Sequence, residues 1–259
     1  MKPIDVHTHL SSQEFDSDRA EVVARALEVC DAFIDIGSGT SPDAFAKAEA
    51  LANSYSRVFF TAGIHPHDAT ELGHQNEILS AIERSTQHKK CVAVGECGLD
   101  NYYEHSNPAD QARIFEWHKN LAKKVGLPLM IHTRDAEDET KKILNTFEGQ
   151  AVFHCFTGTK EAVKDGLAKG FFISFSGIVT FKNAEDLRQT FLGLPLESIL
   201  IETDSPYLAP VPMRGKRNET SLLQYTAKFL AELRGLSLDE FTRKTRDNSL
   251  RAFPKMRLS

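Results

Sequence analysis

Eight short apolar segments recur along the 259-residue chain, spaced at intervals of roughly 20 to 35 residues. Helical patterns lie between them, for example a stripe formed by Val23, Ala26 and Cys30. Eight strands that alternate with helices over about 250 residues are typical of a (β/α)₈ barrel. The expected strands lie at residues 3–9, 32–37, 58–64, 91–96, 127–132, 151–156, 171–177 and 198–204. The chain is therefore predicted to be an α/β protein, a single TIM-barrel domain over residues 1–259.

A doubly wound open sheet is the alternative fold, but the first expected strand argues against it. Such a sheet would carry a glycine-rich phosphate loop at that point, whereas this chain has His7-Thr8-His9-Leu10. Asn107, Pro108 and Gly126 predict the start and end of one helix, as cap, first residue and stop. Ser237 and Glu240 form a capping box for a last helix.

The charge balance excludes a globally basic nucleic-acid coat protein. The chain has 31 basic and 36 acidic residues, a net charge of −5. A polyanionic substrate would have to meet local positive charge or bound metal ions. With 41% hydrophobic residues the chain can bury a sizeable core.

The cysteines and the chain ends predict a cytoplasmic protein. Cys30, Cys91, Cys97 and Cys155 are scattered without a C-x-x-C pair, so reduced thiols are expected. The N-terminus has no apolar stretch typical of a signal peptide, and no apolar run is long enough to span a membrane. We expect no membrane association and a monomer.

Residues that can bind a metal stand at the ends of five of the eight expected strands. The two histidines of H-x-H project to one face of a strand, because side chains alternate with period two. Burying so many polar groups without a ligand would be costly. The predicted metal ligands are His7, His9, Glu96, His132, His154 and Asp204.

Four imidazoles and two carboxylates exceed the needs of one tetrahedral site, so we expect two divalent cations, Mg, Mn or Zn. His7 and His9 would hold one ion, and His132 and His154 the other. Glu96 would bridge the two ions and be catalytic, because its strand lies between the two histidine groups in barrel order. Asp204 would bind an ion and also act as a catalytic base, or orient the attacking water, whose pKa metal coordination can bring to about 7.

Other residues are candidates for substrate binding or for support of the ligands. His65 and Arg134 follow expected strands and could contact a substrate phosphate. Arg214 and Arg217 lie in a short cationic loop after the last strand, where barrels often bind phosphate. Glu202 is expected to orient a ligand. Surface or packing positions are expected for His74, His88, His105 and His118, and His67 is left open between the surface and the site.

Seven motifs in chain order together resemble the TatD family of metal-dependent deoxyribonucleases, which are amidohydrolase-type barrels. The motifs are IDVHTHL, GIHPH, GECGLDNYY, PLMIHTR, HCFTG, LIETDSPYLAP and RGKRNE. The resemblance implies metal binding by the same six residues and hydrolysis of DNA phosphodiesters, usually exonucleolytic, with a divalent cation. Ser11, Asn101 and Thr220 depart from the family pattern, but none is a predicted ligand.

The sequence thus predicts a metal-dependent hydrolase whose substrate is DNA, with RNA or aminoacyl-tRNA as further candidates. Metal-activated water attacks carbonyl and phosphoryl centres alike, so an ester or amide hydrolase with the same site is the nearest alternative. The resemblance includes relatives linked to D-aminoacyl-tRNA deacylation, an ester hydrolysis. A catalytically silent metal-binding protein is the third hypothesis, against which the intact set of six ligands argues.

Overall fold

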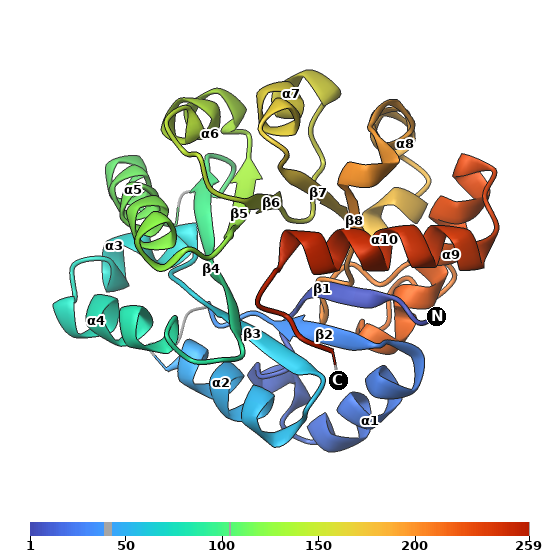
Figure 1. Ribbon diagram of the computed structural model, residues 1–259, viewed down its shortest axis with the longest axis horizontal. Coiled ribbons are helices and arrows are strands. Elements are labelled where there is room, and N and C mark those ends of the chain that lie inside the picture. Colours follow the sequence, from blue (N-terminus) through green and yellow to red (C-terminus); the bar gives the residue numbers. More distant parts are fainter. Residues whose placement is uncertain (39–42, 104, 259) are drawn as a thin grey trace.

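The computed structural model confirms the barrel, and it describes residues 1–38, 43–103 and 105–258. Eight parallel strands form one sheet in chain order, surrounded by helices (Figure 1). The strands are β1 (Ile4–Thr8), β2 (Ala32–Asp35), β3 (Val58–Ala62), β4 (Cys91–Asp100), β5 (Leu129–Arg134), β6 (Ala151–Phe153), β7 (Phe172–Phe175) and β8 (Ile199–Ile201). Parallel order with helical crossovers is the topology that the alternating sequence pattern predicts.

The helices follow the strands around the outside of the barrel (Figure 1). They are α1 (Arg19–Val29), α2 (Ala44–Ser54), α3 (Ala69–Leu72), α4 (Asn76–Ser85), α5 (Pro108–Val125), α6 (Glu137–Leu144), α7 (Lys160–Ala168), α8 (Glu185–Gly193), α9 (Leu223–Arg234) and α10 (Leu238–Ala252). Short 3-10 helices are η1 (Gln13–Phe15), η2 (Pro66–Asp68), η3 (Gly177–Thr180), η4 (Leu196–Ser198) and η5 (Thr220–Leu222).

The predicted helix caps are confirmed at α5 and α10. The Asn107 side chain accepts a hydrogen bond from the Ala109 amide at the start of α5. Gly126 ends this helix with φ 68°, a left-handed conformation that glycine adopts without a Cβ penalty. At α10 the Ser237 side chain accepts from the Glu240 amide.

Backbone hydrogen bonds between β1 and the segment after β8 close the barrel at its carboxyl end. The Asp204 amide donates to the His7 carbonyl over 2.9 Å, and the His9 amide donates to the Ser205 carbonyl over 2.8 Å. The closure therefore joins the backbones of three predicted ligands directly.

Two apolar clusters form the core. The larger lies between the sheet and the surrounding helices. The smaller takes side chains from all eight strands, which places it inside the barrel, together with Phe253 and Met256 from the C-terminal segment. The Lys255 ammonium donates to the His88 carbonyl just before β4, so this segment covers the amino end of the strands. The opposite, carboxyl end is left for the functional residues.

The strand ends differ from the sequence prediction in two ways. β4 extends to Asp100 instead of ending at Glu96, because its pairing with β5 continues through Asp100 and Arg134. β6 and β8 end earlier than predicted, at Phe153 and Ile201. There the chain turns to hydrogen-bond with neighbouring strands, as in the bond from the Glu202 amide to the Phe175 carbonyl.

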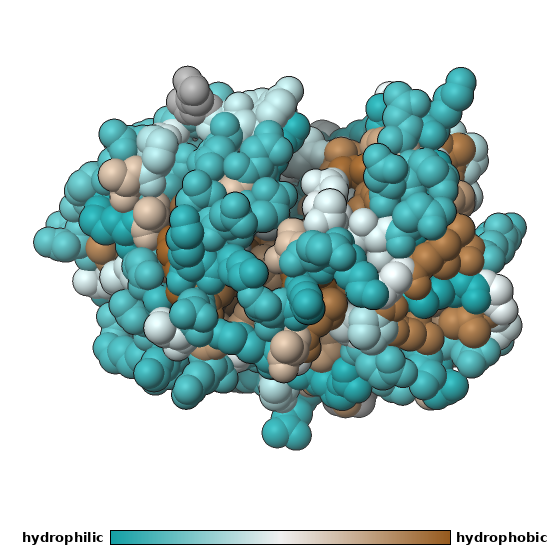
Figure 2. Space-filling model, turned by 90° about the horizontal axis from the view of Figure 1, so that it is seen from above, coloured by the Kyte–Doolittle hydropathy of each residue, from teal (hydrophilic) through white to brown (hydrophobic). Residues whose placement is uncertain are grey.

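The outer surface seen in Figure 2 is mostly hydrophilic, with hydrophobic residues in smaller patches between. Among the helices in the described ranges, none combines the length and the apolar character needed to cross a bilayer. All four cysteines are free thiols, as the sequence predicts.

We expect His118 to make the fold sensitive to acid. Its ring is fully buried, with Nε2 accepting from the Ile64 amide and Nδ1 donating to the Ile114 carbonyl. Burial lowers the pKa of His118 to about 4, so the unfolded chain binds more protons below its ordinary pKa of about 6.5. The stabilisation that comes from keeping His118 neutral is fully present above pH 6.5. The free energy of unfolding should fall by about 3 kcal/mol as the pH drops to about 4.

Urea unfolding at a series of pH values measures this loss. A His118→Gln variant should lose less stability than the wild type between pH 6.5 and 4. An unchanged pH slope in that variant would assign the acid sensitivity to other groups.

Candidate metal centre

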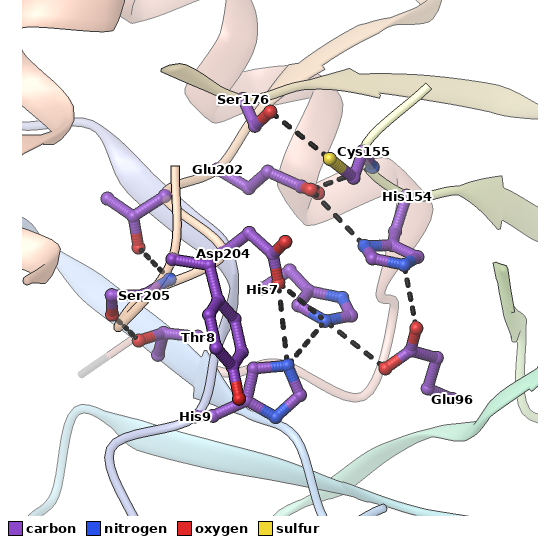
Figure 3. Close-up of polar contacts among 12 residues, drawn as sticks. His7, Thr8, His9, Glu96, His154, Cys155, Ser176, Glu202, Asp204 and Ser205 are labelled. Carbon is purple, nitrogen blue, oxygen red and sulfur yellow. Dashed lines mark hydrogen bonds and ion pairs between the residues drawn. The ribbon is translucent and has the colours of Figure 1, made fainter. Parts of the chain in front are cut away.

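The structure brings all six predicted metal ligands together at the carboxyl end of the barrel. Figure 3 shows five of them, which point toward one another from β1, β4, the end of β6 and the segment after β8. The sixth, His132, comes from β5 and lies with Nδ1 3.3 Å from Nε2 of His154.

The six residues form two groups, and these match the pairing expected from barrel order. His7, His9 and Asp204 make up the first group, in which the Asp204 Oδ1 lies 3.6 Å from Nε2 of His7 and 3.4 Å from Nε2 of His9. Glu96, His132 and His154 make up the second.

Glu96 reaches both groups with different oxygens of one carboxylate. Its Oε1 lies 2.7 Å from Nε2 of His154 and 3.1 Å from Nδ1 of His132. Its Oε2 lies 3.5 Å from Nε2 of His7. This arrangement is the one that a bridging carboxylate requires.

The donor atoms fit divalent cations. Nε2 of His7 faces Nε2 of His9 at 3.3 Å, and the same distance separates the facing nitrogens of His132 and His154. Two ring nitrogens at this distance can share one proton at most, so at least one nitrogen of each pair has a free lone pair. These lone pairs face the space between the rings, where a metal ion could bind. Imidazole nitrogens with carboxylate oxygens suit Zn²⁺ or Mn²⁺, and the carboxylates also admit Mg²⁺.

Electrostatics hold Glu96 ionised inside this cluster. Burial favours its neutral form, but His154, His65 and the other neighbouring imidazoles keep the pKa of Glu96 well below its usual range. Burial likewise opposes charge on His154, yet Glu96 and Glu202 hold the pKa of His154 well above its usual range. The buried carboxylates Glu96 and Glu202 therefore favour positive charge at this place, as a cation site requires.

Glycines on either side of Glu96 allow β4 to lie very close to β5. Gly95 has φ 134°, and a Cβ there would lie 2.5 Å from the Met130 carbonyl oxygen. Gly98 has φ 143°, and a Cβ there would lie 1.9 Å from the His132 carbonyl oxygen. Only glycine fits both the conformation and the space, and this close approach places Glu96 beside His132.

Two residues just beyond β8 and β6 have backbone conformations that direct their side chains. Asp204 and Cys155 have left-handed conformations, with φ 55° and 41°. The Cys155 thiol contacts Oγ of Ser176 at 3.2 Å and points away from His154 (Figure 3). Cys155 thus packs against Ser176, and the turn directs its side chain there.

Two carboxylates outside the six contact the ligand histidines. Glu202 accepts from the Cys155 amide at 2.7 Å and lies 3.3 Å from Nδ1 of His154, which fits the predicted orienting role. Asp100, which sequence reasoning missed, lies 3.0 Å from Nε2 of His132 and 2.9 Å from Nε2 of His67. The spacing of Glu96, Gly98 and Asp100 on one strand face could have revealed it, had β4 been extended past Glu96.

The predicted substrate-binding residues lie in different surroundings. Nε2 of His65 is 3.4 Å from Glu96 at the metal centre. Arg134 lies over the rings of Tyr102 and Tyr103, at 4.0 and 4.7 Å from their centroids. Arg214 lies 3.6 Å over the Phe181 ring.

Arg217 is held by acidic and carbonyl groups near the first helix. It donates to both Asp18 oxygens and, over 2.8 Å, to the Glu14 carbonyl. This contact ties the cationic loop to the segment before α1 and neutralises part of its charge.

The five other histidines occupy varied positions. His118 is buried and His74 pairs with Asp110 at the surface, as expected of packing and surface residues. His88 is partly buried beside Phe60, and His105 is exposed next to His67. His67, left open by the sequence, is only partly exposed and contacts Asp100 beside the metal centre.

Comparison with known proteins assigns the family. The model of the family described as TatD related DNase matches residues 4–254. The chain belongs to the TatD family. It is 36% identical over 253 residues to the Bacillus subtilis (strain 168) uncharacterized metal-dependent hydrolase YabD, covering 96% of this chain and 98% of that protein.

Two further TatD relatives support the assignment. The Shigella flexneri 3'-5' ssDNA/RNA exonuclease TatD is 35% identical over 241 residues, covering 89% of this chain and 91% of that protein. The crystal structure of the Escherichia coli TatD homologue YJJV superposes with a TM-score of 0.88 at 27% identity, covering 97% of each chain. The protein is therefore a metal-dependent hydrolase of the TatD family.

Proposed function

We propose that this protein is a deoxyribonuclease that removes nucleotides from the 3' end of single-stranded DNA, using two divalent ions held by the six ligands. The observation that carries the proposal is the Glu96 carboxylate, whose two oxygens reach the two ligand groups separately. Paired ions bridged in this way suit in-line displacement at phosphorus. The name of the Shigella relative supports both the polarity and the single-stranded substrate, and admits RNA as well.

Divalent ions at this centre would act as Lewis acids on a phosphoryl oxygen and make water nucleophilic at neutral pH. Asp204 would accept the proton of the attacking water. Burial favours its neutral form, but hydrogen bonding with His9 and the charge of His7 lower the pKa of Asp204. The carboxylate is therefore ionised at neutral pH and available as a base.

His65 would donate a hydrogen bond to the substrate phosphate. Its Nδ1 accepts from the His67 amide over 3.1 Å, so the neutral ring carries its proton on Nε2. Burial lowers the pKa of His65 to about 4, which keeps the ring neutral at pH 7. The Nε2 donor lies beside Glu96 and is thus fixed next to the metal centre.

Exposed aromatic rings favour a single strand over a duplex. Tyr207 is 56% exposed and follows β8 at the carboxyl end of the barrel. Tyr102 is 57% exposed after β4, with Arg134 over its ring. Unpaired bases can stack on such rings, whereas paired bases in a duplex are already stacked.

We predict that Arg214→Ala weakens substrate binding without impairing the chemical step. Arg214 is exposed, and none of the described carboxylates pairs with it, so its charge is available for a phosphate. KM should rise and the dependence of log KM on log salt should lose a slope of about 0.7, the value of one phosphate contact on a single strand. Steady-state kinetics from 50 to 200 mM salt measure both.

Arg243→Ala is the matched control, because Arg243 is exposed on α10 near Met1, at the amino end of β1 and away from the metal centre. An equal rise in KM for both variants would indicate a general charge effect and no specific contact. Arg217→Ala should have a smaller electrostatic effect than Arg214→Ala, since Asp18 already neutralises part of the Arg217 charge.

Digestion of DNA labelled at either end, with Mn²⁺ or Mg²⁺, tests the proposed function. Stepwise shortening from the 3' end of single strands, absent in Asp204→Asn, is the expected result. Failure of the fully metallated wild type to cleave any strand would reject the nuclease and direct attention to aminoacyl esters.

A further inference from the structure

Asp100 lies at the end of β4, and each of its two carboxylate oxygens has two polar partners. Its Oδ2 lies 3.0 Å from Nε2 of His132 and 2.9 Å from Nε2 of His67. Its Oδ1 accepts from the amides of Tyr102 and Tyr103 over 3.0 and 2.8 Å. The carboxylate is buried, so none of these contacts is exchanged freely with water.

The backbone of Asp100 is fixed as firmly as its side chain. The Asp100 amide donates to Oε1 of Gln111 over 2.8 Å, and Nε2 of Gln111 donates back to the Asp100 carbonyl over 3.2 Å. Gln111 is buried in α5. Asp100 therefore presents a rigid acceptor to the two imidazoles.

This acceptor determines which nitrogen of His132 faces the metal centre. Both ring nitrogens of His132 face a carboxylate oxygen, Nε2 that of Asp100 and Nδ1 that of Glu96. An ion bound by Glu96 would occupy the Glu96 oxygen, so the ring proton would lie on Nε2 toward Asp100 and Nδ1 would carry the lone pair. Nδ1 is the atom that lies 3.1 Å from Glu96 and 3.3 Å from Nε2 of His154. The lone pair of His132 is thus directed into the metal centre.

His154 shows the same arrangement with its nitrogens exchanged. Glu202 lies against Nδ1 of His154, which leaves Nε2 for the metal centre. The two histidines of the second ligand group would therefore bind through different atoms, each selected by its own outer carboxylate. Such partners fix the orientation and raise the basicity of ligand histidines.

The same contacts argue against a further cation between His65, His67 and His132, three residues whose ring nitrogens lie close enough to share one. His65 has its proton on Nε2, because Nδ1 accepts the His67 amide. With the Glu96 oxygen bound to an ion, His132 would have its proton on Nε2, which faces Asp100. These contacts leave the tautomer of His67 open, but its Nε2 also faces Asp100.

We propose that Asp100, held by His67 and two backbone amides, is a positioning residue that makes His132 a metal ligand through Nδ1. The inference rests on the proposed metal role of His132 and is independent of the substrate. It goes beyond the six ligands by naming what selects the ligating atom of one of them.

Asp100→Asn should reverse this selection while preserving the shape of the site. The Asn oxygen must stay on the Tyr102 and Tyr103 amides, because an NH₂ group cannot accept from them. The NH₂ group would then face His132 and require Nε2 to accept, which moves the ring proton to Nδ1. Zn²⁺ would have to displace that proton, so its affinity at one site should fall by about 10- to 100-fold.

The test combines two measurements on the whole protein, neither of which depends on cleavage of a substrate. Zn²⁺ titration of the metal-free protein gives the affinity of each site for wild type and Asp100→Asn. Long-range ¹H–¹⁵N NMR of the Zn²⁺-loaded wild type identifies the protonated nitrogen of His132. Asp110→Asn is the matched control, since Asp110 also accepts from Nε2 of a histidine, His74, but at the surface.

Weakened Zn²⁺ binding in Asp100→Asn alone, with the His132 proton on Nε2 in the wild type, is the expected outcome. Wild-type affinity in Asp100→Asn would overturn the proposal. If that variant does not fold, the wild-type NMR measurement still decides: a proton on Nδ1 of His132 would overturn the proposal, and one on Nε2 supports it. A nuclease assay can fail without affecting either measurement.

Discussion

Glu96→Gln is expected to abolish metal-dependent hydrolysis, with kcat/KM falling by at least about 10³-fold. Removing a bridging carboxylate should cost several kcal/mol of transition-state stabilisation, and each 1.4 kcal/mol is about a factor of ten in rate. Gln offers one carbonyl oxygen in place of two carboxylate oxygens, so it can reach only one ligand group at a time. Initial rates on end-labelled single strands, with metal content determined on the same samples, measure the effect.

The control for this variant is Glu185→Gln, which alters an exposed ion pair with Arg188 on α8. The control should retain wild-type rate and metal content, whereas Glu96→Gln should lose at least one bound ion. A Glu96→Gln enzyme with two ions and near wild-type rate would show that Glu96 does not bridge them.

Asp204→Asn is expected to lower kcat by about 10²- to 10⁴-fold, the usual effect of losing a general base. Asn adopts left-handed conformations at least as readily as Asp, so the backbone at φ 55° should be preserved. The amide oxygen can still face His7 and His9, but the side chain can no longer accept a proton from water. KM and metal content should therefore change much less than kcat.

The contrast between the two variants separates their roles. Metal titration beside steady-state kinetics should show loss of an ion in Glu96→Gln and loss of turnover with ions retained in Asp204→Asn. Loss of metal equal to that in Glu96→Gln would make Asp204 a structural ligand only. Unchanged turnover would exclude Asp204 as the base.

The barrel and the meeting of the six residues could be predicted because both follow from short-range patterns. His7 and His9 share a strand face by alternation, and the carboxyl ends of parallel strands meet at one end of a barrel. Glu96 could be placed between the two histidine groups from barrel order alone. The structure adds the atomic detail that its two oxygens reach different groups.

Other features depend on tertiary contacts that the sequence pattern does not carry. The positions of Asp100 and His67 follow from the extension of β4 beside β5 and from the turn after β3, which bring both residues to His132. The sequence places Arg217 in a cationic loop typical of phosphate binding. Its partner Asp18, which the sequence pattern does not reveal, lies nearly two hundred residues away along the chain. Residues so far apart in sequence come into contact only when the barrel closes.

Anomalous X-ray diffraction from crystals grown with Mn²⁺ tests the central claim most directly. Two ions are predicted, one against His7, His9 and Asp204 and the other against His132 and His154, with one Glu96 oxygen bound to each. A single ion, or two ions that share no contact with Glu96, would contradict the account.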